Sequence, residues 1–420
     1  MMHLKSMTFA LGVLFLVTSC TDGETDEIRN VTEITFNTRV SRATVTTTGS
    51  LKDFKVWADA DNYSSMIIDG EVATKKEGQS YFSLDNPKIW PPEVHAIRFW
   101  AVSPSEISAD IITTSQSIKD FAPDIDITKQ IDLVTAYTRQ ERSSGTTSIP
   151  MKFKHALSQI IIRAKEAGGD NETKKILIKG AWIVNARSQG SLVCTDDSDN
   201  NYMSWNVPVS ADKKVYGAEF DAAVELTHEF RSLLDYNKAT GSGTNMMLVP
   251  QQLDTWNIND DVEKVSNSNK GAYILLLCRV EAVHNGGVHE GEQSGSVKPG
   301  TISHTHQMFP YTERFDESEY GFTCVPISSN WEAGKSYVYN LEFCGAYAGA
   351  GIYPPVGDLA GMPDGGGSYV KTLPADKSVG DPVLDSPIIF DVNVTPWDER
   401  PWTPGQSDAD AEADTASDGI

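Results

Sequence analysis

Ile388-Ile389-Phe390-Asp391-Val392-Asn393-Val394-Thr395 alternates apolar and polar side chains. Successive side chains of a β-strand point to opposite sides, so a period of two is the pattern of a strand that buries one face. One face of this segment carries the apolar residues Ile388, Phe390, Val392 and Val394. We expect a half-buried strand here, closing the fold.

The same period recurs along the chain. Strand-like runs cover residues 51–58, 95–102, 158–165, 175–184 and 336–343. Turn-forming residues separate these runs, and the chain contains 32 Gly and 20 Pro. Many short strands joined by such turns are typical of β-sandwiches and β-barrels. The sequence therefore predicts an all-β protein.

The N-terminus indicates the compartment. Residues 7–17 are almost wholly apolar, which suits a signal-peptide core and is too short for a permanent membrane span. Val17-Thr18-Ser19-Cys20 then resembles a bacterial lipobox. We expect removal of residues 1–19, a lipid anchor on Cys20, an acidic tether over residues 20–30, and export to the outer-membrane surface. An ordinary signal peptide with a chance cysteine is the alternative.

The length favours two domains. At 420 residues the chain exceeds the size at which a single core usually stops growing. A polar, glycine-containing break at residues 166–171 lies between two predicted strands, so we expect domains at 31–168 and 169–402. The break could instead be a hairpin turn within one domain. Residues 403–420 are acidic and small, a composition that predicts a disordered tail.

The charge excludes two kinds of partner. The chain has 35 basic and 58 acidic residues, a net charge of −23. Nucleic acids and anionic membrane surfaces both attract positively charged proteins, so neither is expected to bind this chain directly.

Four cysteines follow Cys20, and none has the spacing of a metal site: Cys194, Cys278, Cys324 and Cys344. In an exported protein they could form one or two disulfides or remain buried thiols. The sequence leaves their pairing open.

The motifs of common enzyme classes are missing. The sequence has no G-x-S-x-G, P-loop or H-E-x-x-H motif. His304 and His306 alternate but have no third ligand at a suitable spacing, so we interpret them as part of a surface loop. Asp59-Ala60-Asp61 lacks the remainder of an EF-hand loop and is interpreted as a solvated turn. We expect no catalytic residues, no metal and no cofactor.

The nine tryptophans suggest sugar binding as a second function to consider, because exposed aromatic rings stack on sugars. Trp57 and Trp100 lie in predicted strands, which favours core packing over a binding platform. A surface glycan-binding lipoprotein stays the alternative function.

Several segments occur in an informative order. Ile34-Thr35-Phe36-Asn37 follows the lipobox, and Trp90-Pro91 precedes Ile97-Arg98-Phe99-Trp100-Ala101-Val102-Ser103-Pro104. Phe153-Lys154-His155-Ala156-Leu157-Ser158-Gln159 comes next, and residues 380–397 end the series. This set resembles the fimbrillin family of Bacteroidales, with its Mfa-like and FimA-like fimbrial lipoproteins, whose most recognisable run is F-x-H-A-L-S-Q. Residues 195–334 contribute little to the resemblance.

The resemblance implies two tandem transthyretin-like β-sandwich domains. It implies a structural or adhesive function, in which subunits polymerise into, anchor or tip a surface fibre used for adhesion and biofilm formation. The expected partners are other fimbrial subunits, with a host or bacterial surface ligand as a further candidate.

The family's assembly scheme also carries over to particular residues. Trimming after an arginine removes the first strand, and a neighbouring subunit donates a strand to the groove. By resemblance, the removable strand lies within residues 31–42 and contains Ile34 and Phe36. Arg42 is preferred over Arg39 as the trimming site, because the small Ala43 follows it.

The candidate donor is the closing strand at residues 388–394, since the acidic tail has no alternating apolar segment. If that strand is held in its own domain, the chain fits the tip of a fibre. Stem, tip and anchor positions stay open.

Overall fold

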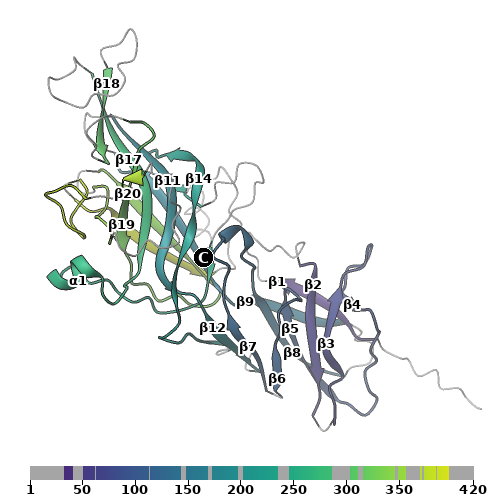
Figure 1. The fold of residues 1–420 in the computed structure, drawn as a ribbon. Coiled ribbons are helices and arrows are strands. Elements are labelled where there is room, and N and C mark those ends of the chain that lie inside the picture. The colour runs from purple at the N-terminus through teal and green to yellow at the C-terminus, as the bar shows by residue number, and fades with distance from the viewer. Residues whose placement is uncertain are drawn as a thin grey trace, which may run out of the picture.

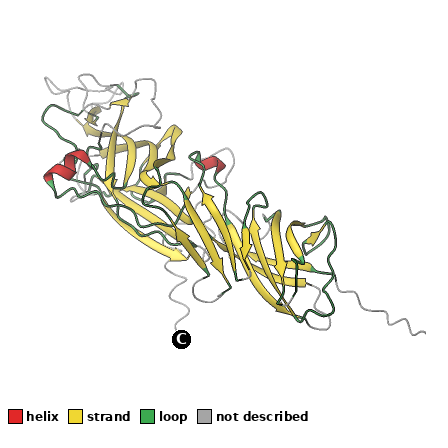
Figure 2. Ribbon diagram, turned by 60° about the horizontal axis from the view of Figure 1, so that its bottom comes forward, coloured by secondary structure: helices red, strands yellow, loops and turns green. Residues whose placement is uncertain are grey.

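The computed structural model is almost entirely β-structure (Figures 1 and 2). It describes residues 33–40, 51–61, 63–112, 114–142, 148–168, 173–196, 202–234, 246–285, 303–310, 316–345, 349–355, 369–370, 373–384 and 386–396. These residues contain one α-helix, α1 (Asp261–Ser266), and one 3-10 turn, η1 (Ile127–Lys129). No helix among them is long and apolar enough to cross a bilayer. The predicted all-β fold class is confirmed.

Seven strands form the sheet of the N-terminal half, in the order β1-β9-β8-β5-β2-β3-β4. Their bounds are β1 Thr35–Val40, β2 Asp53–Asp59, β3 Ile68–Thr74, β4 Ser83–Leu84, β5 Ala96–Ser103, β8 Val134–Glu141 and β9 Ser148–His155. β1 pairs with β9 in parallel, whereas the other neighbours are antiparallel. A backbone bridge between Phe36 and Phe82 joins β1 to the chain just before β4, so the sheet closes on itself.

The closed sheet encloses a cluster of phenylalanine rings. The ring centroid of Phe54 lies 5.6 Å from that of Phe36 and 5.2 Å from those of Phe82 and Phe153. None of the four side chains is more than 3% exposed. Three of them alternate with polar residues along β1, β2 and β9, so the period of two places them on the inner face.

A four-stranded sheet covers the outer face of the first sheet. Its order is β13-β12-β7-β6, with bounds β6 Asp110–Ile112, β7 Ser115–Phe121, β12 Gly190–Thr195 and β13 Met203–Asn206. Trp57 and Trp100, which pair across β2 and β5, are buried between these two sheets. β12 and β13 come from far along the chain, so these two strands return to cover the N-terminal half.

The C-terminal half is a sandwich of two further sheets. The first has the order β15-β10-β20-β22, with β16 also paired to β10. The second has the order β14-β11-β17-β19-β21, with β18 also paired to β17. The bounds of the first are β10 Ser158–Glu166, β15 Arg231–Ser232, β16 Met246–Leu248, β20 Lys335–Phe343 and β22 Ile389–Pro396. Those of the second are β11 Thr173–Arg187, β14 Lys213–Glu225, β17 Tyr273–Asn285, β18 Ser303–Phe309, β19 Tyr320–Pro326 and β21 Tyr369–Val370.

The chain passes from the N-terminal half to this sandwich between β9 and β10. β10 pairs with β20 in parallel over eight residue pairs, and its Ile160 and Ile162 are buried in the sandwich core. Residues 158–166, assigned above to the N-terminal domain, therefore lie in the C-terminal sandwich. The polar break at 166–171 connects β10 to β11 within that sandwich. Polar residues and glycines are common in any surface loop, so this composition does not identify a domain boundary.

The two halves lie end to end in an elongated molecule (Figures 1 and 2). The transthyretin-like form of each half stays a prediction.

Replacing Phe54 tests this description of the N-terminal core. We expect Phe54→Ala to lower the free energy of unfolding of this half by about 3–5 kcal/mol, because it leaves a cavity among three other rings. Phe390→Ala on β22 is the matched control, since that side chain is 37% exposed and should cost much less. Denaturant unfolding of both variants, followed by tryptophan fluorescence, measures the difference. Equal losses would contradict a central position for Phe54.

Candidate functional site: a first strand held in an apolar groove

β1 lies between β9 and the chain just before β4, at the start of the seven-stranded sheet (labelled in Figure 1). Along one edge it forms six parallel residue pairs with β9. Along the other edge, the backbones of Phe36 and Phe82 exchange two hydrogen bonds of 2.9 Å. The N–H of Ile34 also donates to the carbonyl of Lys88 at 2.8 Å. Backbone hydrogen bonds therefore hold β1 on both sides.

Ile34 and Phe36 direct their side chains into the apolar core. Ile34 is 2% exposed and Phe36 is fully buried. The ring of Phe36 meets Phe54 and Phe99 edge-on, with centroids 5.6 and 5.9 Å apart. Asn37 faces solvent. β1 thus lies over apolar side chains of the core and forms backbone hydrogen bonds along both of its edges.

β9 depends strongly on its contact with β1. It forms six residue pairs with β1 but only two with β8, at Val134–His155 and Thr135–Lys154. If β1 left, most of one edge of β9 would lose its hydrogen-bond partners, and the pockets of Ile34 and Phe36 would open. Unpaired strand edges of this kind readily accept another strand.

The two candidate trimming sites differ in position. Arg39 lies within β1, where its backbone is in register with Lys152 of β9. Its peptide bond to Val40 is therefore part of the paired ladder. Arg42 lies outside the described residues, as does the candidate lipidation site Cys20.

The closing strand β22 forms eight antiparallel pairs with β20 and is at the edge of its sheet. Phe390 and Val392 pair with Leu341 and Tyr339, which are fully buried, so the predicted apolar face does point toward the sandwich interior.

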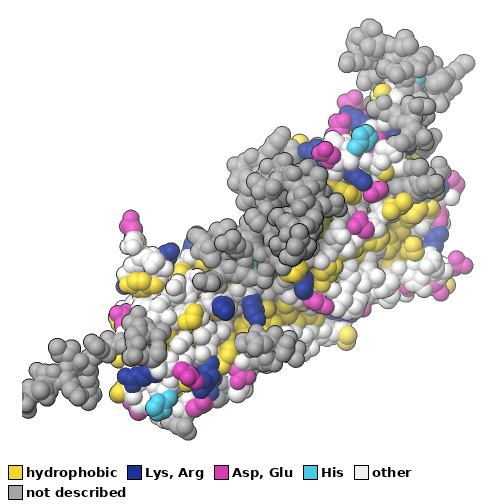
Figure 3. All heavy atoms as spheres, turned by 180° about the vertical axis from the view of Figure 1, so that it is seen from behind, with side chains coloured by type: hydrophobic (Ala, Val, Ile, Leu, Met, Phe, Trp, Pro, Cys, Tyr) yellow, Lys and Arg dark blue, Asp and Glu magenta, His cyan; other side chains and the backbone are white. Residues whose placement is uncertain are grey.

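The prediction that this whole face is buried is wrong. Ile388 is buried and Val392 partly buried, but Phe390 is 37% and Val394 is 51% exposed. The reason is the edge position: β20 covers one side of β22, and no described strand pairs with its other side. Figure 3, the view from behind, shows hydrophobic side chains gathered along the C-terminal sandwich.

The F-x-H-A-L-S-Q run joins the two cores residue by residue. Phe153 belongs to the phenylalanine cluster, and Nδ1 of the buried His155 lies 2.9 Å from Oδ1 of Asp132. Ala156 and Leu157 pack in the layer beneath the four-stranded sheet, and the Ser158 hydroxyl donates to the carbonyl of Glu332 at 2.8 Å. Sequence reasoning identified the run but missed Asp132 and Phe82, because neither has a local pattern that marks it as a partner.

Asp59 and Asp61 are partners of an arginine. Arg98 on β5 donates to both oxygens of Asp59, at 2.7 and 3.2 Å, and to Asp61 at 2.5 Å. Asp59 is thus engaged in a partly buried ion pair, which corrects the interpretation of this segment as a solvated turn. The hydrogen bonding of Arg98 to Asp59 is the main reason that the pKa of Arg98 is raised.

His304 and His306 also differ from their interpretation. They lie on β18, with ring centroids 4.6 Å apart, and His304 is 1% exposed. The surface-loop interpretation is wrong for His304, because β18 pairs with β17 and turns that side chain inward. In the part of the chain that the structure describes, no three His, Cys, Asp or Glu side chains gather as metal ligands would.

The four described cysteines are buried free thiols. Burial raises the pKa of Cys194 and of Cys344 to about 11, so their thiolates are scarce at neutral pH.

The tryptophans form core rather than a binding platform. All those within the described ranges are buried except the half-buried Trp205, whose indole N–H donates to the carbonyl of Ala156 at 2.7 Å. The interpretation of Trp57 and Trp100 as core residues is confirmed.

Comparison with known proteins places these features in a family. A family model described as Fimbrillin-like matches residues 38–349 of the chain. No curated protein matches.

Among solved structures, a fimbrial protein from Bacteroides vulgatus aligns with a TM-score of 0.50 and 13% identity, covering 86% of this chain and 99% of that one. A candidate cell adhesion protein from Parabacteroides distasonis aligns with a TM-score of 0.40 and 10% identity, covering 87% and 99%. The first likeness supports the fold alone.

The family match is to fimbrial structural proteins, so this protein is a fimbrial subunit and not an enzyme. Because the match extends over more than half of the sequence, the chain belongs to the fimbrillin-like family.

Proposed function

We propose that this chain is a fimbrial subunit that assembles by strand exchange, with β1 as the strand that leaves. The observation that carries the proposal is the unequal pairing of β9, with six residue pairs to β1 and two to β8. A subunit that loses β1 needs another strand in the same position. A strand from a second subunit restores both the ladder and the buried side chains.

The energetics favour refilling the groove over leaving it empty. Burial of an Ile or Phe side chain contributes about 1.5–3 kcal/mol each; Ile34, just before β1, and Phe36, within it, are both buried. An empty groove also leaves backbone groups of β9 without partners, which adds to its cost. An emptied groove is therefore expected to bind a suitable extended strand but not the folded surface of another subunit.

β22 is the donor in this proposal. Among the described strands it pairs along one edge only, and the apolar face that it turns toward its own sandwich is partly exposed at Phe390 and Val394. Phe390 and Val392 have the same two-residue spacing as Ile34 and Phe36, so they can occupy the same kind of pockets. Release of such a strand disturbs its own core less than release of a central strand.

Trimming supplies the trigger for exchange. Proteases bind their substrates as extended segments, and a peptide bond paired in a sheet does not fit a protease cleft. This argument favours cleavage after Arg42 over cleavage after Arg39, whose bond to Val40 lies in the ladder with β9. A lipid on Cys20 would hold untrimmed chains at the outer membrane, so trimming would also release the chain into the fibre.

Limited digestion with an arginine-specific protease tests the protection of Arg39. In the full chain we expect cleavage after Arg39 to be slow, because β1 must first unpair. Phe36→Ala should accelerate it by about 100-fold or more, since a loss of about 3–5 kcal/mol raises the open population tenfold per 1.4 kcal/mol.

The matched control is Asn37→Ala, which changes the solvent face of the same strand. Mass spectrometry of the new N-termini gives the rate at each arginine. Equal acceleration by both variants would contradict a role for the buried face in holding β1.

Assembly in solution tests the donor. After removal of β1 by the same protease, we expect wild-type protein to form polymers visible by electron microscopy. Val392→Asp should abolish them, because a carboxylate cannot enter an apolar groove without a large desolvation cost. Asn393→Asp is the control on the opposite face of β22 and should assemble normally. Normal polymers from Val392→Asp, with unchanged monomer stability in both variants, would exclude β22 as the donor.

A further inference from the structure

A groove separates the four-stranded sheet of the N-terminal half from the loops of the C-terminal sandwich. One wall is β13, with Met203, Ser204 and Trp205. The opposite wall is formed by residues 250–252 and 330–333. A second hollow, lined by Lys214, Lys270 and their neighbours, shares Arg187, Val209 and Asp254 with the groove, so the two are adjacent.

The wall formed by β13 presents an open backbone edge. β12 is its partner on one side, and no other described strand pairs with it. The N–H of Thr195 donates to the carbonyl of Tyr202, and in an antiparallel ladder such bonded pairs alternate. Ser204 therefore directs its backbone groups toward β12, while Met203 and Trp205 direct theirs away from it. An edge of this kind can accept an extended peptide.

The groove is positively charged in a strongly acidic protein. Its two parts contain five basic side chains, Lys154, Arg187, Lys213, Lys214 and Lys270, and three acidic ones, Asp212, Asp254 and Glu332. The whole chain has a net charge of −23.

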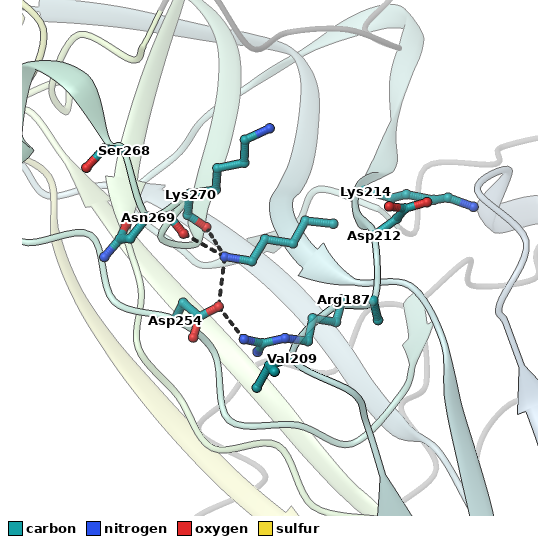
Figure 4. A pocket seen from close by; sticks show the side chains of 10 residues that line it. Arg187, Val209, Asp212, Lys214, Asp254, Ser268, Asn269 and Lys270 are labelled. Carbon is teal, nitrogen blue, oxygen red and sulfur yellow. Dashed lines mark hydrogen bonds and ion pairs between the residues drawn. The ribbon is translucent and has the colours of Figure 1, made fainter.

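One carboxylate is shared between two cations (Figure 4). Oδ2 of Asp254 accepts from Arg187 at 2.6 Å and lies 2.7 Å from Nζ of Lys213. Burial opposes ionisation of Asp254, but hydrogen bonds from Lys213 and Arg187 outweigh it and lower the pKa of this carboxyl. Among the described residues, Lys214 and Lys270 form no ion pair within 4.0 Å. Positive charge therefore remains for an anionic ligand.

The chain itself contains a matching anionic segment. Residues 405–420 include five Asp and Glu and no Lys, Arg or Pro. The last residue of β22, Pro396, pairs with Lys335, two positions after Ala333 in the groove wall. The eight residues 397–404 span up to about 25 Å when extended, which brings the acidic segment within reach of the groove.

We propose that the groove along β13 binds the acidic segment 405–420 of the same chain. Its carboxylates pair with Lys214 and Lys270, and its backbone adds to the open edge of β13. Bound there, the segment contacts both halves of the molecule and braces their junction. The proposal stands independently of strand exchange at β1.

Carbodiimide coupling of the full chain tests the charge contacts, because it forms amide bonds between carboxylates and lysines that already touch. Peptide mass spectrometry of the monomer should find residues 408–418 joined to Lys214 or Lys270 at low salt. These links should disappear at 1 M salt, where screening extends over about 3 Å. Lys119 and Lys129 are the controls: both are 68% exposed and lie outside the groove.

Hydrogen exchange at single-residue resolution tests the backbone contact. The comparison is with a full-length variant in which Asp408, Asp410, Asp414 and Asp418 become Asn and Glu412 becomes Gln. The amides of Met203 and Trp205 should exchange several-fold faster in the variant, while that of Ser204, bonded to β12, should not change.

Two results would overturn the proposal. One is coupling spread evenly over Lys119, Lys129 and the groove lysines, or found only between two copies of the chain. The other is equal exchange of Met203 and Trp205 in both proteins.

Discussion

Most of the strand pairing of β9 lies along the edge that β1 occupies. Two residue pairs hold it to β8, and six hold it to β1. β9 continues directly into β10, which supplies a strand of the C-terminal sandwich. The position next to β9 therefore affects more than the end of one sheet. It determines whether the run from Phe153 to Ser158, which links the phenylalanine cluster to the second core, is anchored at its start.

In the proposed strand exchange, this constraint lets the same chain exist first as a closed monomer and then as a subunit. With β1 in place, the groove is filled and the molecule has no strong tendency to accept a foreign strand. Without β1, the open apolar pockets and the unpaired edge of β9 favour binding of a strand from another subunit. The C-terminal half supplies an edge strand with a partly exposed apolar face, at Phe390 and Val394. Acceptor and donor thus lie in different halves, which suits head-to-tail growth of a fibre.

The sequence predicts features that depend on local pattern and fails where distant contacts decide. The period of two was enough for the all-β class and for the core positions of Trp57 and Trp100. The exposure of Phe390 could not be predicted, because it depends on the edge position of β22 in its sheet, which the sequence pattern does not reveal. The return of residues 190–206 to the N-terminal half, and the pairing of Asp59 with Arg98, are likewise long-range contacts without a local signal. The groove along β13 arises only when five separate segments of the chain meet.

The most direct test of strand exchange is the N-terminus of the protein in sheared surface fibres, compared with that in the outer-membrane fraction. The account predicts fibre-borne chains that start after β1, at Ala43 or nearby, and therefore lack the buried Ile34 and Phe36. Chains that remain in the membrane should start at a lipidated Cys20 and retain β1. Fibre-borne chains that still contain residues 33–40 as part of the intact polypeptide would contradict the account, because the groove beside β9 would then be filled by the subunit's own strand.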